Sequence, residues 1–205
     1  MAPRRGLRRG ERGAHRPRHC PRPGGGPRDR RPAVLTFRPP TSRHPVATPF
    51  DAIAGAPNAC QVFPNLLTAG QPHRRQLEAL AALGDVLVLD LRDPAEPREF
   101  DEPALARELG LDYVNIPISQ HTLTDDSLER ILRVLREHES RTVFFHCASA
   151  SRVGGALVAH FMLDHGWNEE RAVREAMRVG LRSPAYLQWA LGYVARQRRG
   201  DRPQA

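Results

Sequence analysis

Two short, continuous apolar runs constrain the fold of this chain more strongly than any other feature of its sequence. They read DVLVLDL at residues 85–91 and TVFFH at residues 142–146. Runs of this kind are typical of strands that are covered on both faces, as in a parallel sheet. Segments with helical periodicity lie between and after them. The pattern therefore predicts an α/β domain with a mainly parallel central sheet flanked by helices.

The other elements follow from local patterns of apolar and turn-forming residues. Short strands are expected at 61–63, 65–70 and 112–118, and helices at 73–84, 101–110, 124–139, 153–165, 169–179 and 184–198. The first two helices end on a glycine, and the last begins with a serine followed by a proline, which are ordinary boundary signals. Ligands in such sheets bind beyond the carboxyl ends of the strands, so a site is expected just after residue 146.

The first 45 residues differ in composition from the rest of the chain. They contain 13 of the 31 arginines and 9 of the 19 prolines, but only two acidic residues, Glu11 and Asp29. The remaining residues are slightly acidic, so the net charge of +8 comes from the beginning of the chain. Such a segment buries too little apolar surface to fold. We therefore expect a disordered N-terminal tail at 1–49, one α/β domain at 50–199 and a disordered C-terminus at 200–205.

Composition also limits the classes of partner and compartment. The arginine-rich tail lacks the interleaved aromatic residues that stack on bases, so a nucleic-acid partner is not expected. No apolar stretch reaches the roughly 20 residues needed to span a bilayer, so no membrane partner is expected either. The three cysteines, at positions 20, 60 and 147, have neither metal-ligand spacing nor an even disulfide pattern. A reducing, cytoplasmic location is the expectation.

One segment, FFHCASASRVGGA at 144–156, has the composition of an anion-binding loop. It passes from a strand into a helix, where several backbone N–H groups and the helix dipole can face one bound anion. Small side chains let the backbone approach that anion, and Arg152 adds a planar donor suited to phosphate. A thiolate at Cys147 would be able to attack the bound phosphorus atom. The alternative is that Cys147 is only a small buried residue at the end of a core strand.

The segment VFFHCASASRVGG resembles the His-Cys-x5-Arg signature of cysteine-dependent protein tyrosine and dual-specificity phosphatases, with one residue fewer. The shorter form, Cys-x4-Arg followed by Val-Gly, resembles the bacterial phosphatase-like domain of beta-lactamase-hydrolase-like proteins. With PNLLTAGQP (64–72), VLVLDLRDPAE (86–96) and LDYVNIPI (111–118), the resemblance covers most of residues 58–197. It implies a metal-independent phosphatase that needs no cofactor and acts on a phosphorylated protein or a small-molecule phosphate.

The resemblance also implies roles for individual residues. Cys147 would be the nucleophile, and Arg152 would bind the phosphate together with the loop N–H groups. Residues expected to bind the substrate are His146, Ala148, Ser149, Ala150, Ser151 and Val153. His146 would also orient the loop and help tune the thiol. The general acid is left open between Asp93 and Asp125, because Gln120 stands where dual-specificity phosphatases often carry an aspartate. Glu96, which lies just past the same strand as Asp93, is a further candidate for the general acid.

Two alternatives to a phosphatase stay open on the sequence alone. A cysteine followed by four residues and an arginine also resembles single-domain rhodaneses, in which Cys147 would carry a persulfide. The strand DVLVLDLRDPAE is similar to a rhodanese strand, but the Gly-His-Ile-Pro-Gly-Ala stretch expected after it is missing. The second alternative is a catalytically silent phosphate-binding module. It is favoured by Ala150, which stands where the phosphatases usually have glycine.

Overall fold

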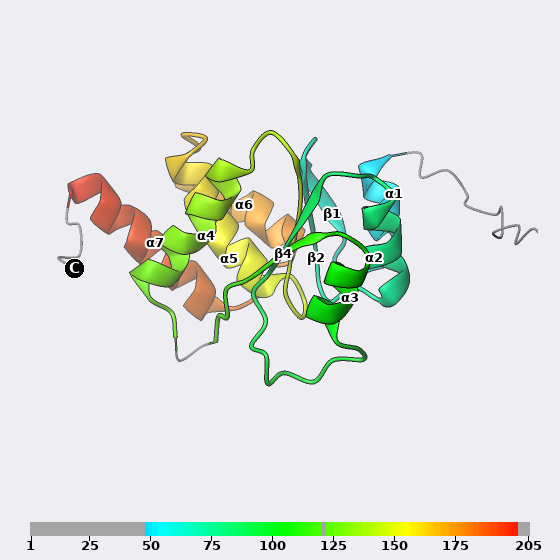
Figure 1. Ribbon diagram of the computed structural model, residues 1–205. Helices are drawn as coiled ribbons and strands as arrows, with labels where there is room; N and C mark the ends of the chain where they lie inside the picture. The colour runs from blue at the N-terminus through cyan, green and yellow to red at the C-terminus, as the bar shows by residue number, and fades with distance from the viewer. Residues whose placement is uncertain (1–47, 120–121, 201–205) are drawn as a thin grey trace, which may run out of the picture. The chain divides into compact units, whose positions relative to one another are not determined.

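The structure is a computed structural model that describes residues 48–119 and 122–200. Its central sheet is made of β1 (Cys60–Phe63), β2 (Leu66–Ala69), β3 (Val86–Asp90), β4 (Asp112–Asn115) and β5 (Thr142–His146). The strand order is β1-β2-β5-β3-β4, with β1 antiparallel to β2 and the other neighbours parallel. The expected α/β architecture with a mainly parallel sheet is confirmed, and β5 is the central strand (Figure 1).

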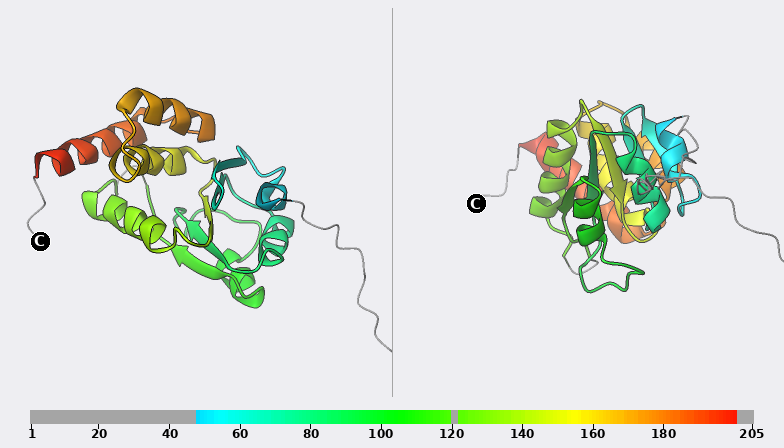
Figure 2. Two further views of the ribbon diagram at one scale, coloured as in Figure 1. Left: turned by 90° about the horizontal axis from the view of Figure 1, so that it is seen from above. Right: turned by 45° about the vertical axis from the view of Figure 1, so that its right-hand side comes forward.

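Helices cover both faces of this sheet. The helices of the described residues are α1 (Pro49–Ile53), α2 (Arg74–Ala81), α3 (Glu102–Glu108), α4 (Asp125–Glu137), α5 (Ser151–Leu163), α6 (Glu169–Val179) and α7 (Pro184–Arg199). Helices α1, α2 and α3 share one buried apolar cluster with the sheet. Helices α4 and α5 share a second cluster with the opposite face, and α6 and α7 pack against α5. Figure 2 shows the two groups of helices on either side of the strands.

Alternation along the central strands explains why their sequences are continuously apolar. Leu87 and Leu89 of β3 belong to the cluster with α4 and α5, whereas Val86 and Val88 belong to the cluster with α1–α3. All four side chains are at most 2% exposed. Burying an aliphatic side chain contributes about 1.5–3 kcal/mol relative to leaving it exposed, so both faces of β3 require apolar residues.

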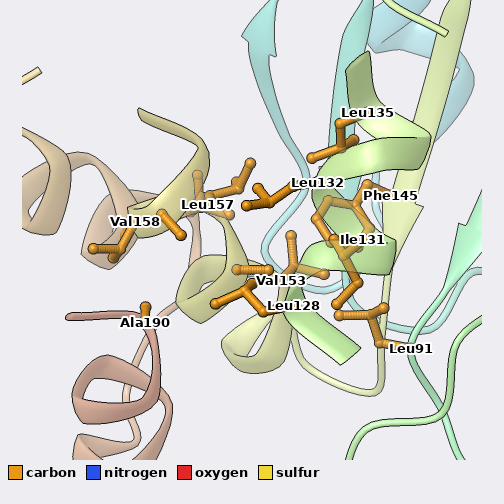
Figure 3. Packing of buried hydrophobic residues seen from close by; sticks show 14 of the residues in the cluster. Leu91, Leu128, Ile131, Leu132, Leu135, Phe145, Val153, Leu157, Val158 and Ala190 are labelled. Atoms are coloured by element: carbon orange, nitrogen blue, oxygen red, sulfur yellow. The ribbon is translucent and has the colours of Figure 1, made fainter. Parts of the chain in front are cut away.

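Helix α4 covers the sheet next to the candidate site. Its buried residues Leu128, Ile131, Leu132 and Leu135 recur at helical spacing and form one apolar stripe. Figure 3 shows this stripe packed between Phe145 of β5 and residues of α5. The Thr124 side chain accepts a hydrogen bond from the Ser127 N–H and so caps the start of the helix. The stripe therefore packs α4 against β5, the strand that leads into the loop.

The expected strands and longer helices all occur, with ends that differ by at most three residues from the sequence-based boundaries. Helix α1 was not expected, because its five residues are too few to show a period. Helix α5 begins at Ser151, earlier than expected, so Arg152 lies in its first turn. Nearly all of the expected tail at 1–49 and of the C-terminus at 200–205 lies outside the described residues. No helix at 48–119 or 122–200 has the length and apolar character needed to cross a membrane.

Candidate active site

The loop from Cys147 to Arg152 joins the end of β5 to the start of α5. Residues His146, Ala69 and Asp90 end the three adjacent parallel strands β5, β2 and β3 in register, so the loop emerges at the carboxyl edge of the sheet. Cys147 is 1% exposed and Arg152 is 8% exposed. The sequence placed a site at this edge, and the structure brings the cysteine and the arginine to it on one short loop.

The carbonyl groups of the loop are held by neighbouring segments. The Gln71 N–H donates to the carbonyl of Ala148 (3.1 Å), the Asn58 side-chain amide donates to that of Ser149 (3.1 Å), and the Gly154 N–H donates to that of Ala150 (2.9 Å). Within the described part of the chain, four N–H groups of the loop have no acceptor; they belong to Ala148, Ser149, Ser151 and Arg152. Unpaired N–H groups at the start of a helix form a ready anion site.

The two terminal nitrogens of the Arg152 guanidinium are held by hydrogen bonds to other parts of the protein. Its Nη1 donates to the carbonyls of Leu91 (3.2 Å) and Ile118 (2.9 Å), and the two terminal nitrogens contact the two Glu96 oxygens at 2.5 and 2.9 Å. Burial alone would raise the pKa of Glu96, but hydrogen bonds from Arg152 and the Asp93 N–H lower it to about 2. Burial alone would lower the pKa of Arg152, but Glu96 and the nearby Cys147 raise it. Glu96 is therefore an ionised partner that orients the arginine.

Several solved structures share the fold of this chain. No protein-family model matches the chain. A DUF442 protein from Shewanella putrefaciens, proposed to be a phosphatase, superposes with a TM-score of 0.60 at 21% identity, covering 72% of this chain and 97% of that one. P. aeruginosa TpbA in complex with pTyr superposes with a TM-score of 0.54 at 19% identity, covering 75% and 91%. The chain has a cysteine-phosphatase fold.

A sequence relative carries the name of the proteins that the loop sequence resembles. The beta-lactamase hydrolase-like protein of Agrobacterium fabrum is 30% identical over 98 residues, which are 46% of this chain. The match covers 22% of that relative, so the chain spans about a fifth of its length. The family resemblance that the loop sequence suggested therefore agrees with the solved structures, which share the fold although their identity to this chain is low.

The loop at 147–152 accommodates Ala150 through a paired glycine. Ala150 has φ 64° and ψ 2°, the left-handed conformation that favours glycine, and its side chain is fully buried. A Cβ atom at Gly180 would lie 2.9 Å from the Ala150 Cβ, so the absence of a side chain at 180 makes room for this methyl group. Gly70, directly after β2, acts similarly, since a Cβ there would lie 2.7 Å from the Ala148 carbonyl oxygen. The loop therefore keeps its turn at some backbone strain.

We expect Ala150 and Gly180 to be energetically coupled. Gly180→Ala should lower the free energy of unfolding by roughly 2–4 kcal/mol, because it adds a clash to a positive φ. In an Ala150→Gly background the loss should be smaller by about 1 kcal/mol or more, whereas Ala150→Gly alone should change stability by no more than about 1 kcal/mol. Urea unfolding of the four proteins measures the coupling.

Gly84→Ala is the matched control for backbone strain alone. Gly84 also has a positive φ, of 100°, but a Cβ there would meet no atom within 4 Å. Its loss of stability should be the same with alanine or glycine at position 150. Additive effects of the substitutions at 150 and 180 would show that the two positions do not share space.

The candidate general acids lie in different surroundings. The Asp93 N–H donates to Glu96 Oε1 (2.9 Å), the same oxygen that contacts Arg152, so Asp93 lies beside the loop. Asp125 begins α4 and is held by Arg196 of α7 in a two-point ion pair at 2.7 and 2.5 Å. The structure thus brings the backbone of Asp93 near the arginine, while its carboxylate accepts a hydrogen bond from the Ala95 N–H (2.8 Å). It ties Asp125 to another helix. Gln120 lies outside the described residues.

Several loop residues expected to bind substrate have other contacts. The Ser151 hydroxyl oxygen accepts hydrogen bonds from the N–H groups of Arg182 (3.0 Å) and Ser183 (3.3 Å), which fixes the loop to the start of α7. The Val153 side chain is fully buried beside Leu128 of α4, because it lies on the inner face of α5 (Figure 3). Only the backbone of Val153 remains as a ligand contact. The side chains of Ala148 and Ser149 are exposed.

His146 also does not reach the open side of the loop. Its side chain is completely buried, because alternation along β5 turns it away from Cys147 toward the α3 face of the sheet. There its Nε2 lies 2.8 Å from Glu102 Oε1, and its ring stacks on Phe144. The expectation that His146 contacts substrate is corrected, whereas the expectation that it supports the loop agrees with this position.

Sequence reasoning missed a chain of polar contacts that runs around the loop. Arg92 donates to Glu96 (3.2 Å) and to the Gln71 side-chain oxygen, and Gln71 donates to Glu102 (2.7 Å), which contacts His146. Arg152 at one end of the loop is thus connected to His146 at the other. The i,i+4 spacing of Arg92 and Glu96 is the only local signal, since the other partners are distant in sequence.

Tyr186 of α7 is a further residue near the loop that the sequence did not indicate. Burial raises the pKa of its hydroxyl, and the nearby charges of Arg152, Cys147 and Glu96 also act on it. The contact with α5 is close at this point, because a Cβ atom at Gly155 would lie 2.7 Å from the Tyr186 Cβ. Tyr186 therefore belongs to the surroundings of the loop although it lies 34 positions after Arg152 in the sequence.

Proposed function

We propose that this protein is a cysteine-dependent phosphatase that hydrolyses phosphomonoesters. The observation that carries this proposal is the loop itself. Within the described residues, N–H groups from Ala148 to Arg152 have no acceptor, while the carbonyls of Ala148 and Ser149 accept hydrogen bonds from other segments. N–H donors together with one guanidinium suit the three equatorial oxygens of a phosphoryl group in transfer. The fold shared with known phosphatases supports the same reaction class.

The proposed reaction has two steps and uses no metal ion or cofactor. In the first, the Cys147 thiolate bonds to phosphorus, the bond from phosphorus to the leaving oxygen breaks, and a carboxylic acid protonates that oxygen. In the second, water attacks the cysteinyl phosphate, the sulfur–phosphorus bond breaks and inorganic phosphate leaves. Arg152 and the loop N–H groups stabilise the charge on the equatorial oxygens in both steps.

We assign the general acid to Asp93. Its place beside the Glu96–Arg152 pair supports this choice, whereas the ion pair with Arg196 keeps Asp125 in a structural contact. Asp93→Asn should lower kcat/KM for an alkyl phosphate by about 100-fold but reduce hydrolysis of an activated aryl phosphate much less, because only the poor leaving group needs a proton. Asp125→Asn is the matched control and should change kcat/KM for both substrates by less than about threefold. A larger loss on the alkyl phosphate in Asp125→Asn would reverse the assignment.

For the substrate we propose an aryl phosphate such as phosphotyrosine. P. aeruginosa TpbA has the same fold and is known in complex with pTyr. Both a phosphorylated protein and a small phosphate satisfy the loop, because the loop recognises the phosphoryl group alone. Parallel assays of a phosphotyrosine peptide, a phosphoserine peptide and free phosphotyrosine rank these classes directly by kcat/KM.

The experiment that tests the function is capture of the phosphorylated enzyme. The purified chain is mixed with a generic aryl phosphate near pH 6, quenched within milliseconds and digested, and the peptide that contains Cys147 is examined by mass spectrometry. Phosphate on Cys147 together with turnover supports the proposal. A rise in the thermal midpoint with inorganic phosphate, without turnover and without phosphate on Cys147, would favour a silent binding module. The strained Ala150 is the observation that supports this alternative. Thiosulfate-to-cyanide sulfur transfer would favour a rhodanese.

A further inference from the structure

A cavity of about 430 Å³ lies at the amino edge of the sheet, opposite the edge from which the loop at 147–152 emerges. Leu66 begins β2 and Val143 lies near the start of β5, and both residues line this cavity. Two histidines line it as well, His160 from the last turn of α5 and His165 from the segment that follows. The proposed phosphatase reaction gives neither histidine a part.

His160 is held by a carboxylate. Its Nδ1 lies 2.7 Å from Asp164 Oδ2, and the Arg136 Nε donates to the other oxygen of Asp164 (2.8 Å). Burial alone would raise the pKa of Asp164, but the hydrogen bonds from His160 and Arg136 lower it. Because the carboxylate is ionised, it accepts the Nδ1 proton, and a neutral His160 ring then has its lone pair on Nε2. Histidines that bind metal ions usually donate their other ring N–H to a carboxylate in this way.

The rings of His160 and His165 are arranged as two ligands of one ion. Their Nε2 atoms lie 3.1 Å apart, their planes are nearly perpendicular at 86°, and their centroids are 4.7 Å apart. At this nitrogen separation, two rings that both point at an ion about 2.05 Å away have centroids about 4.8 Å apart. Rings joined by a straight N–H···N hydrogen bond would have centroids about 5.4 Å apart. The observed distance therefore favours two nitrogens that converge on one point.

The surroundings of His165 suit a metal ligand. The residue is exposed, so an ion has a path to it, and its ring packs on Phe63 at a centroid distance of 4.5 Å. Burial of part of the side chain and the nearby His160 lower the pKa of His165, so the ring is neutral at pH 7, as a metal ligand must be. Glu139 is an exposed carboxylate that lines the same cavity, and its negative charge acts on His165.

A second group of ligand-type side chains, Asp90, Glu102 and His146, is less suited to a metal ion. Their ligand atoms lie within 4.8 Å of one another, and all three side chains are completely buried. Arg98 already contacts both carboxylates, at 2.8 and 3.1 Å, and its positive charge opposes a cation there. Between His160 and His165, no cation of the described residues is interposed in this way.

We propose that His160 and His165 bind a divalent transition-metal ion at the end of α5, with Glu139 and solvent to supply its other ligands. Imidazole nitrogen suits zinc, copper and nickel, whereas magnesium and calcium prefer oxygen. On binding, the proton between the two Nε2 atoms moves to Nδ1 of His165, so neither ring changes its charge. The ion would join the last turn of α5 to the segment before α6. The inference does not depend on the proposed phosphatase activity.

The first test uses zinc as the probe and the full chain. Metal-free protein competes with a chromophoric chelator for Zn²⁺ at pH 7.5, which gives the number of bound ions and their affinities. His165→Gln should lose one bound ion and remain folded, because residue 165 is exposed. Asp164→Asn should weaken the same site by about tenfold or more, since it no longer fixes the His160 proton.

Two controls separate this site from the other ligands in the chain. His73→Gln removes a histidine whose side chain is 50% exposed and contacts Glu99, and it should bind zinc as the wild type does. Cys147→Ser should also keep the ion. Equal zinc binding by the wild type and His165→Gln would overturn the proposal, as would loss of the ion in Cys147→Ser alone, which would place it on the loop thiol.

The second test locates the ion directly. In 15N spectra of the full chain, zinc should shift the Nε2 resonances of His160 and His165 and leave those of His73 unchanged. The His165 ring should at the same time become the tautomer with its proton on Nδ1. Unchanged Nε2 resonances of the pair at saturating zinc would show that the two rings only share a hydrogen bond, and the proposal would fail whatever the protein hydrolyses.

Discussion

Replacing Cys147 by serine should abolish hydrolysis of an aryl phosphate, with a loss of about 10⁴-fold or more. A serine hydroxyl is a far weaker nucleophile than a thiolate, and the positive charges around the loop cannot ionise it. The rest of the site should remain intact, because within residues 48–119 and 122–200 no hydrogen bond of the Cys147 side chain holds the loop together. The variant should therefore still bind inorganic phosphate, which is measured as a rise in its thermal midpoint at increasing phosphate concentration.

Cys60→Ser is the matched control for this substitution. Cys60 is also a free, buried cysteine, but it lies in β1, which β2 separates from β5 and the loop that follows it. The control should keep its activity within about threefold and lose only some stability. Activity that survives in Cys147→Ser would exclude the covalent mechanism and would require an activated water molecule in place of the cysteine.

Arg152→Lys should reduce kcat/KM by roughly 10²–10³-fold. Lysine keeps the positive charge but lacks the planar guanidinium, and it cannot contact the two Glu96 oxygens and two backbone carbonyls at once. We expect the stabilisation by inorganic phosphate to be lost together with activity, because the same group binds the ground state. Both losses are measured on one preparation by initial rates and thermal unfolding.

Arg174→Lys provides the comparison for the arginine substitution. Arg174 lies on α6 with an exposed side chain and forms an i,i+4 pair with Glu170. Such surface pairs contribute little, so neither activity nor phosphate binding should change measurably. If Arg152→Lys retained phosphate binding and most of its activity, charge alone would suffice and the Glu96 contact would have no role in orienting the arginine.

Much of the fold follows from the sequence because its signals are local. The continuous apolar runs of β3 and β5 and the apolar stripe of α4 each depend on residues close together in the chain, so their elements and even the layer order were predictable. Helix α1 was not, because a five-residue helix depends on its Thr48 cap and on packing against α2. The place of the loop at the sheet edge follows from the parallel strand order.

The site was only partly predictable, for a physical reason. Cys147 and Arg152 lie on one loop and carry their own signal, but the groups that support them come from β2, β3, α3 and the segment before α3. Glu102 looks in the sequence like an ordinary acidic residue at a helix start. Its burial against His146 is visible only after β3 and β5 are paired and α3 is packed. Sequence also could not separate Asp93 from Asp125, because the Arg196 ion pair is a tertiary contact.

The contact between Ala150 and Gly180 has a consequence for how this loop can change over evolutionary time. Only one of the two positions has space for a methyl group. A lineage that moves from glycine to alanine at 150 must already have glycine at 180, whereas the reverse order passes through an intermediate with a strained, overpacked loop. The order of the two substitutions is therefore constrained. In any descendant, whether position 150 accepts alanine depends on the residue at position 180, at the end of α6 and 30 positions away.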